Sequence, residues 1–419
     1  MQKIKPALRS SNFDREASVA IPSKIFPFLI ALLFSLNLLS AYESAIPSPL
    51  AAKYMTGNWD GWRDILENHG VVFTSSFMTE CVGNPTGGRA QGFTYTGSYG
   101  LNLDIDFEKA CGWTGFEIFS SMAWRTGTSL SQRKINNQFA VQELYGGQTV
   151  KLNELYFKKT LWNGCFAFKA GRMNGANDFL ISPLYCYFVN LAFCGNPVSI
   201  LYNTAFTDYP FAQWGAYLHF KPHDMLLIKG GVYNGNTNVN KNKYHGLNFT
   251  FKSTNGVIWI TECDLLVNLK PKERYPGNYK AGFFYQTANT KIFSGGVGGD
   301  PGFYFQIDQM VFDGITPFAA MIFQPKDRNL MPLFLSSGLV FQGLIANRPQ
   351  DTLSLGYAYG KFSSDLGTGQ NFESVLEATY WWQVNQWLSV MPDLQIIFHP
   401  KGSEIPNAFC LGFQMGFIL

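Results

Sequence analysis

The stretch LNLDIDFE (101–108) alternates apolar and polar side chains along its whole length. In an extended chain, Leu101, Leu103, Ile105 and Phe107 point to one side, and the amide and carboxylates between them point to the other. The segment FEIFSSMAWR (116–125) has the same pattern. A period of two predicts β-strands that each have one apolar and one polar face.

The alternation recurs from residue 71 onward in segments of about ten residues, separated by turns rich in Gly, Asn, Asp and Pro. About seventeen segments fit the pattern, and they lie near 71–80, 101–108, 116–125, 150–160, 165–172, 211–221, 225–234, 243–253, 257–268, 279–288, 302–310, 314–324, 334–344, 350–361, 374–384, 387–397 and 408–418. Strands without covering helices must hide the edges of their sheet, and closure into a barrel does so.

Single-chain bacterial barrels usually have an even number of strands, so one segment belongs to a loop or two are wrongly divided. We therefore predict an all-β transmembrane barrel of about 16 antiparallel strands spanning 71–419, with apolar side chains facing lipid. A secreted β-sandwich or β-propeller is the alternative. The chain lacks the repeat of about 40–50 residues that a propeller would show.

Composition points away from a typical soluble enzyme. The chain has 38 Phe, 20 Tyr and 10 Trp, but only 15% charged residues. After residue 45 no apolar run is long enough for a membrane-spanning helix.

The N-terminus resembles an export signal. Lys24 precedes the apolar run IFPFLIALLFSLNLLSA (25–41), which ends in small residues. We predict a signal peptide over 1–41 with cleavage near 41–45, and a single membrane anchor is the alternative. Removing this segment takes away its net charge of +3, and the near-neutral remainder argues against a nucleic-acid partner.

Residues 42–70 form the segment before the barrel. In TGNWDGWRDILENHG (56–70), Thr56 or Asn58 can cap a helix that Gly70 ends. The apolar side chains of this helix share one face: Trp59, Trp62, Ile65 and Leu66. We expect the helix to dock at the periplasmic end of the barrel, although a membrane surface or a partner could also cover this face.

Several stretches resemble one family, the carbohydrate-selective, OprB-like porins of Gram-negative outer membranes. The matching blocks are TGNWDGWRDILENHGVVF (56–73), GNPTGG (83–88), LNLDIDFEKACGW (101–113), VQELYGG (141–147), LNELYFKKTL (152–161), AGRMNGANDFLISPLYCYFVNLAFCGNP (170–197) and EATYWWQVNQWLSVMPDLQIIFHPKG (377–402). The resemblance implies a sixteen-stranded outer-membrane barrel through which small sugars diffuse passively along a constricted, polar, partly arginine-lined channel. The resemblance does not decide whether the porin is a monomer or a trimer. The alternating pattern by itself indicates only an exported barrel.

The polar face of each strand supplies candidate lumen residues. Sugars are neutral and rich in hydroxyl groups, so a selective pore offers them cationic donors, carboxylate acceptors and aromatic faces. Strand parity and the junction near GRMNGANDF select Asp104, Asp106, Glu117, Arg125, Glu154, Tyr156, Lys169, Arg172 and Asp178. Each of them could instead be a solvated wall residue. A charge on the lipid face would cost about 2–4 kcal/mol at the membrane midplane, which favours the lumen for charged residues.

Two of the seven cysteines lie close together, in LYCYFVNLAFCGNP (184–197). Export permits disulfides, so we predict a Cys186–Cys194 bond that holds a long loop in or over the barrel; two free thiols or a metal site are the alternatives. The states of Cys81, Cys111, Cys165, Cys263 and Cys410 stay open. No CxxC motif occurs and the five histidines are scattered, so we expect no metal, no cofactor and no enzymatic activity.

The sequence fits other functions less well than a sugar channel. A barrel-borne lipase or protease would need a nucleophile paired with His and an acid, and the chain has no GxSxG motif. A general or anion-type porin, and an envelope-structural or adhesion barrel, remain alternatives.

Overall fold

The computed structural model describes residues 52–269 and 273–419. The predicted signal peptide 1–41 and its cleavage near 41–45 lie outside the described residues. No helix in the described part is long and apolar enough to cross a membrane.

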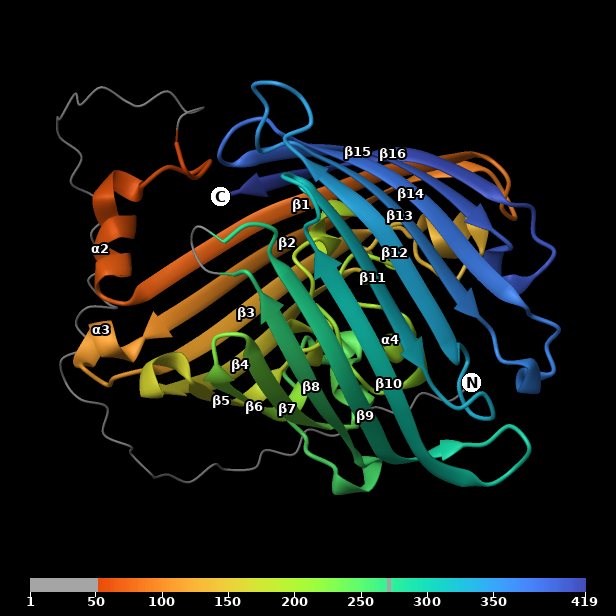
Figure 1. Cartoon of the computed structure of the whole chain (residues 1–419), viewed down its shortest axis with the longest axis horizontal. Coiled ribbons are helices and arrows are strands. Elements are labelled where there is room, and N and C mark those ends of the chain that lie inside the picture. The colour runs from red at the N-terminus through yellow and green to blue at the C-terminus, as the bar shows by residue number, and fades with distance from the viewer. Residues whose placement is uncertain (1–51, 270–272) are drawn as a thin grey trace, which may run out of the picture. The chain divides into compact units, whose positions relative to one another are not determined.

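The described residues form sixteen strands, each paired antiparallel with its neighbours in sequence, and β1 pairs with β16 to close a barrel (Figure 1). Their bounds are β1 Val71–Thr86, β2 Gly92–Asp106, β3 Phe116–Gly127, β4 Thr149–Leu161, β5 Phe166–Met173, β6 Gln213–His223, β7 Leu226–Asn234, β8 Val257–Val267, β9 Gly277–Lys291, β10 Val297–Gln309, β11 Ile315–Phe323, β12 Leu333–Gln342, β13 Thr352–Lys361, β14 Phe372–Gln383, β15 Leu388–Phe398 and β16 Ala408–Ile418. The predicted fold class and strand number are confirmed.

Strand β8 shows why the alternating sequence closes this way. Trp259 and Leu265 are 54% and 45% exposed on the outer face, whereas Ile258, Glu262 and Asp264 are buried inside. A charged side chain on the lipid side would lose its hydration and find no partner there, so the face of the strand that carries the charged side chains points to the interior.

The expected strand at 243–253 is wrong, because this segment is part of loop 235–256. His245 (φ 50°) and Gly246 (φ 74°) adopt left-handed conformations that interrupt an extended chain. The following carbonyl groups bond to side chains instead of a strand ladder: Trp214 Nε1 donates to the Phe249 oxygen at 2.8 Å, and Asn234 Nδ2 donates to the Lys252 oxygen at 3.0 Å.

Few helical segments accompany the strands. They are η2 Trp59–Gly61, α2 Trp62–Asn68, α3 Phe107–Cys111, the π-helix η3 Ser131–Ile135, η4 Trp162–Gly164, η5 Gly175–Asn177, η6 Tyr185–Tyr187, α4 Ser199–Asn203, η7 Thr237–Asn240, η8 Asn242–Tyr244, η9 Ser253–Asn255, η10 Ser364–Leu366 and η11 Pro400–Gly402.

The predicted N-terminal helix exists but starts later than expected. Helix α2 begins after Gly61, and neither Thr56 nor Asn58 caps it. It is held beside the end of β16, because Arg63 Nη2 donates to the Leu419 oxygen at 3.2 Å. Trp62 stays 46% exposed, so the apolar face of the helix is not covered within the described residues.

The two ends of the barrel differ in their connections. Short connections such as 224–225 and 384–387 lie at the end that also carries the C-terminus, whereas loops 128–148, 174–212 and 235–256 lie at the other end (Figure 1). Outer-membrane barrels keep short turns in the periplasm and longer loops outside. We call these the turn end and the loop end, and infer that the loop end faces outward from the cell.

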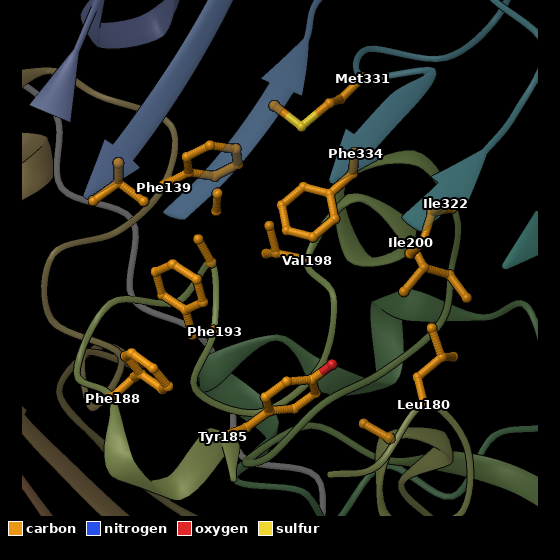
Figure 2. Close-up of a cluster of buried hydrophobic side chains, with 14 of the residues drawn as sticks. Phe139, Leu180, Tyr185, Phe188, Phe193, Val198, Ile200, Ile322, Met331 and Phe334 are labelled. Atoms are coloured by element: carbon orange, nitrogen blue, oxygen red, sulfur yellow. The ribbon is translucent and has the colours of Figure 1, made fainter. Parts of the chain in front are cut away.

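The apolar core lies inside the barrel. Loops 128–148 and 174–212 fold inward and bond to each other, with the Glu143 amide donating to the Val189 oxygen at 3.1 Å. Figure 2 shows Phe193 and Val198 of the second loop gathered with Phe139 of the first and Phe334 of β12. Burying each such side chain stabilises the fold by about 1.5–3 kcal/mol. The lumen is therefore partly filled by protein and is not polar throughout.

Candidate functional site

The two halves of the inner wall differ in what covers them. Inward side chains of β8–β16 are buried under the infolded loops, including Ile258, Tyr304 and Glu377, each at 0% exposure. Inward side chains in the turn-end half of β2–β5 stay partly exposed, whereas those nearer the loop end are buried, so the open part of the lumen follows the turn-end half of these strands. We call the residues that line it the polar lane: Asp104, Glu117, Phe119, Tyr156, Lys158 and Lys169.

The polar lane combines charged groups with an aromatic face. Lys158 Nζ lies 3.0 Å from a Glu117 carboxylate oxygen, and both side chains are about one-third exposed. The ring of Tyr156 lies 5.1 Å from that of Phe119, and Lys169 Nζ lies 5.3 Å from the Tyr156 ring centroid. Donors, acceptors and a ring face are thus presented on one wall.

A buried charge network fixes one side of loop 174–212. Glu262 Oε1 binds Lys229 Nζ at 2.5 Å, and Glu262 Oε2 accepts from the Leu180 amide at 2.9 Å. Asp264 also binds Lys229, at 2.9 Å, and lies 3.9 Å from Lys280. Two cations therefore face two carboxylates at the seam between the loop and strands β7–β9.

A second carboxylate fixes the middle of the same loop. Glu377 of β14 accepts from the amides of Val189 and Asn190 at 2.6 and 3.1 Å. The side chain of Asn190 reaches Gln395 of β15 at 2.8 Å. Because these bonds hold the loop against the β8–β16 wall, the loop narrows the lumen and leaves the polar lane open.

At the loop end the lane meets a narrow cluster. Arg125 donates to the Leu144 oxygen, lies 3.7 Å from Glu143 and covers the Tyr209 ring at 4.9 Å. Burial raises the pKa of the adjacent Asp208 to about 7. A cavity of about 470 Å³ opens here, lined among others by Glu143, Tyr145, Tyr202, Asp208, Tyr209 and Phe211.

One predicted lumen residue, Arg172, lies elsewhere. Arg172 pairs with Leu155 and Trp214, which face outward, and its guanidinium binds Asn240 and Asn248 of loop 235–256 at 3.0 and 3.2 Å. The prediction that Arg172 lies beside the lumen is therefore wrong, because Arg172 lies on the same outward face of β5 as Phe168 and Ala170.

Asp106 lies on the predicted inward face, paired with Glu117. Its carboxylate caps α3, accepting from the Glu108 amide at 2.9 Å and the Lys109 amide at 3.4 Å. Both acceptor bonds serve the helix at the turn end, so the predicted sugar-binding role gains no support.

Three further candidates lie inside the barrel but anchor loops. Arg125 and Glu154 are 2% and 3% exposed, and Glu154 accepts from the Asn174 amide at 2.9 Å and from Asn177 at 2.8 Å. Asp178 binds Lys169, and burial raises the pKa of Asp178. Asp104, Glu117, Tyr156 and Lys169 are the predicted residues that the structure brings together beside open lumen.

The predicted Cys186–Cys194 disulfide is not formed in the structure, where both cysteines are free thiols. The Cys186 thiol donates to the Pro183 oxygen at 2.9 Å, and burial raises the pKa of the Cys194 thiol. The loop does fold into the barrel as expected, but carboxylates and apolar packing hold it. The other cysteines, 81, 111, 165, 263 and 410, are also free.

Sequence reasoning missed most of the loop anchors. Glu262 and Asp264 alternate with Trp259 and Leu265, so their parity already placed them inside. Tyr209 had no such signal, because its position depends on the path of a long loop. Within 52–269 and 273–419, no group of His, Cys, Asp and Glu side chains is arranged to hold a metal ion.

Comparison with known proteins matches residues 90–419 to the family described as "Carbohydrate-selective porin, OprB family". Porin B of Pseudomonas aeruginosa is 28% identical, over 92% of this chain and 96% of the relative. Putative porin QuiX of Acinetobacter baylyi is 24% identical, over 87% and 92%. A solved structure of Pseudomonas putida OprB at high pH superposes with a TM-score of 0.82 at 26% identity, covering 88% of this chain and 99% of that one.

Proposed function

The chain belongs to the OprB family of carbohydrate-selective porins, and from that premise we propose that small sugars cross it along the polar lane. The protein is a sugar-selective porin of the Gram-negative outer membrane. The proposal concerns the route and the residues that meet the sugar.

The asymmetry of the lumen carries the proposal. Loop 174–212 covers the β8–β16 wall, so a solute that passes between the two ends moves along β2–β5. There it meets the exposed pair Glu117–Lys158, whose acceptor and donor can exchange hydrogen bonds with successive hydroxyl groups. Because the pair is solvated, this exchange costs little desolvation and binding stays weak enough for flux.

The aromatic rings of the lane supply the second part of sugar recognition. Phe119 and Tyr156 form a tilted pair at 5.1 Å, and the apolar face of a pyranose ring can pack against such a surface. Lys169 above the Tyr156 ring adds a donor at its edge. The wall thus fits a solute with alternating CH and hydroxyl faces.

The charges of the lane favour a neutral solute over an anion. Asp104 and Glu117 balance Lys158 and Lys169, so the lane itself has no net positive charge. An anion-selective pore would need an excess of cations at its constriction. The balance supports sugars in preference to an anion-type cargo.

Planar-bilayer conductance tests the route, with glucose, maltose and a neutral amino acid as competing blockers. Lys158→Gln should weaken the sugar block severalfold, because it removes a cationic donor from the lane. Lys159→Gln is the matched control, since Lys159 occupies the next position on the outward parity of β4 and donates to the Thr114 oxygen. It should leave the block unchanged.

Two outcomes would refute the proposal. If Lys158→Gln and wild type are blocked equally by maltose, the sugars do not pass along this wall. An ohmic channel that ignores every sugar would remove the selectivity assigned to the lane.

A further inference from the structure

The loops at the loop end carry their charge unevenly. Loops 87–91, 128–148, 174–212 and 235–256, which join strands on the β1–β8 side, contain three carboxylates: Glu143, Asp178 and Asp208. Their cations are Arg89, Arg133, Lys134, Lys241, Lys243 and Lys252. The loops 324–332, 362–371 and 399–407 on the β9–β16 side hold equal numbers of cations and carboxylates. The positive charge of this end is therefore concentrated over β1–β8.

Two of these cations share a pocket with outward aromatic side chains of β2. The pocket has a volume of about 650 Å³, and Phe93, Tyr95, Arg133 and Lys134 line it together with Gly127 and Thr128. Phe93 and Tyr95 are 66% and 41% exposed on the lipid-facing parity of the strand. We call it the basic rim pocket.

The backbone that presents the two cations is fixed. The Ala90 amide donates to the Lys134 oxygen at 2.9 Å, and the Arg89 amide donates to the Ile135 oxygen at 3.2 Å. The Val141 amide reaches the Ser131 hydroxyl at 2.9 Å. Among the described residues, no carboxylate lies within ion-pair distance of the Arg133 or Lys134 side chain. Two cations on a fixed backbone and without a counter-charge constitute a binding surface for an anion.

We propose that the basic rim pocket binds a lipid whose headgroup carries phosphate, in the leaflet that surrounds the loop end. Aromatic side chains at the ends of barrel strands lie at the level of lipid headgroups, which places a phosphate beside Arg133 and Lys134. Phe93 and Tyr95 then contact the apolar part of the same lipid. Arginine and lysine both bind phosphate, the former with two parallel hydrogen bonds.

A lipid fits this pocket better than a second copy of the chain. The pocket lies on the lipid-facing wall, and the loops on the opposite side offer no excess of carboxylates to meet its charge. The pocket also lies outside the channel, so this inference does not rest on the sugar route.

Lipid binding can be measured by native mass spectrometry of the full chain in detergent, titrated with diphosphoryl lipid A. Replacing both cations, Arg133→Gln with Lys134→Gln, should weaken lipid binding about 30-fold, equivalent to about 1 kcal/mol per cation. The matched control replaces the exposed Lys361 and Lys401 of the opposite side by Gln, and should bind as wild type does. Maltose block of conductance should be the same in all three proteins.

A second variant keeps the test decisive if the double replacement fails to fold. Phe93→Ala leaves both cations in place and should weaken lipid A binding while leaving the thermal midpoint unchanged. Equal lipid affinity of the variants and wild type would overturn the proposal. So would equal loss in the Lys361/Lys401 control, or a lipid-independent dimer that Arg133→Gln/Lys134→Gln abolishes, because the latter would assign the pocket to a second copy.

Discussion

Replacing Glu262 by Gln tests whether buried charge holds loop 174–212 against the wall. Glu262 is 0% exposed and binds Lys229, which is 7% exposed, at 2.5 Å. Gln keeps the size of the side chain and an acceptor for the Leu180 amide, so the change mainly removes a negative charge. Lys229 and Lys280 would then share Asp264 alone.

The expected loss of stability follows from burial. Removing one partner of a buried ion pair costs about 3–5 kcal/mol, because the remaining charge is left without compensation. Glu117→Gln is the matched control, since it breaks a Lys–Glu pair in the same lumen that is about one-third exposed. Such solvated pairs contribute about 0–1 kcal/mol.

The assay is the free energy of unfolding of the detergent-folded barrel in urea, measured together with single-channel current noise. Glu262→Gln should lower the free energy by about 3 kcal/mol more than Glu117→Gln and should increase the noise, because the loop is released. Adding Lys229→Met to Glu262→Gln should restore much of the loss, since Asp264 and Lys280 remain balanced. Equal destabilisation by Glu262→Gln and Glu117→Gln would refute the anchoring role, and so would failure of Lys229→Met to recover stability.

Three further outcomes can be measured separately. Burial raises the pKa of Asp208 from its usual value near 4 to about 7, so between these values its carboxyl is protonated in the folded state. The stability that this group contributes should therefore fall as the pH rises from about 4 to about 7. Asp208→Asn should remove this pH dependence from the unfolding midpoints. The exposed thiol of Cys111 should react at once with a water-soluble maleimide, whereas the buried thiol of Cys410 should react only after unfolding. Mass spectrometry of the labelled protein would show the difference. Rapid labelling of Cys410 in the folded barrel would contradict its buried position. Gly87→Ala should destabilise the fold by more than about 1 kcal/mol in urea, because φ is 74° and a Cβ would lie 1.8 Å from the Asn407 oxygen of the neighbouring loop. Gly112→Ala, with φ 83° and open space around it, is the control for backbone strain alone.

The period of two predicted the barrel and the face of most charged residues. Glu117, Lys158 and Lys169 face the lumen because each barrel strand has one water-facing and one lipid-facing side. The alternation of polar and apolar residues along the strand predicts which side is which. The segment 243–253 also alternates, yet the left-handed pair His245–Gly246 and the side-chain donors Trp214 and Asn234 make it a loop. Local alternation does not reveal such partners, which lie 35 and 18 residues away along the chain.

The position of the infolded loop depends on such distant partners. Glu377 is 187 or more residues from the amides that it binds, and nothing in the sequence around Val189 and Asn190 indicates that contact. The sequence did predict that the segment 184–197 belongs to a long loop in or over the barrel. It did not show that carboxylates of the wall, in place of a disulfide, would hold the loop.

Placing the apolar core inside the barrel has a consequence for transport. The outer face of a membrane barrel gains nothing from burying apolar side chains against itself, since lipid already covers them, whereas the infolded loop removes Phe188 and Phe193 from water. The same packing that stabilises the loop also covers the β8–β16 wall and confines the open lumen to β2–β5. Stability and pore width are therefore coupled. Variants that loosen the loop should widen the channel and weaken sugar discrimination together, because the wall opposite the polar lane would no longer be fixed.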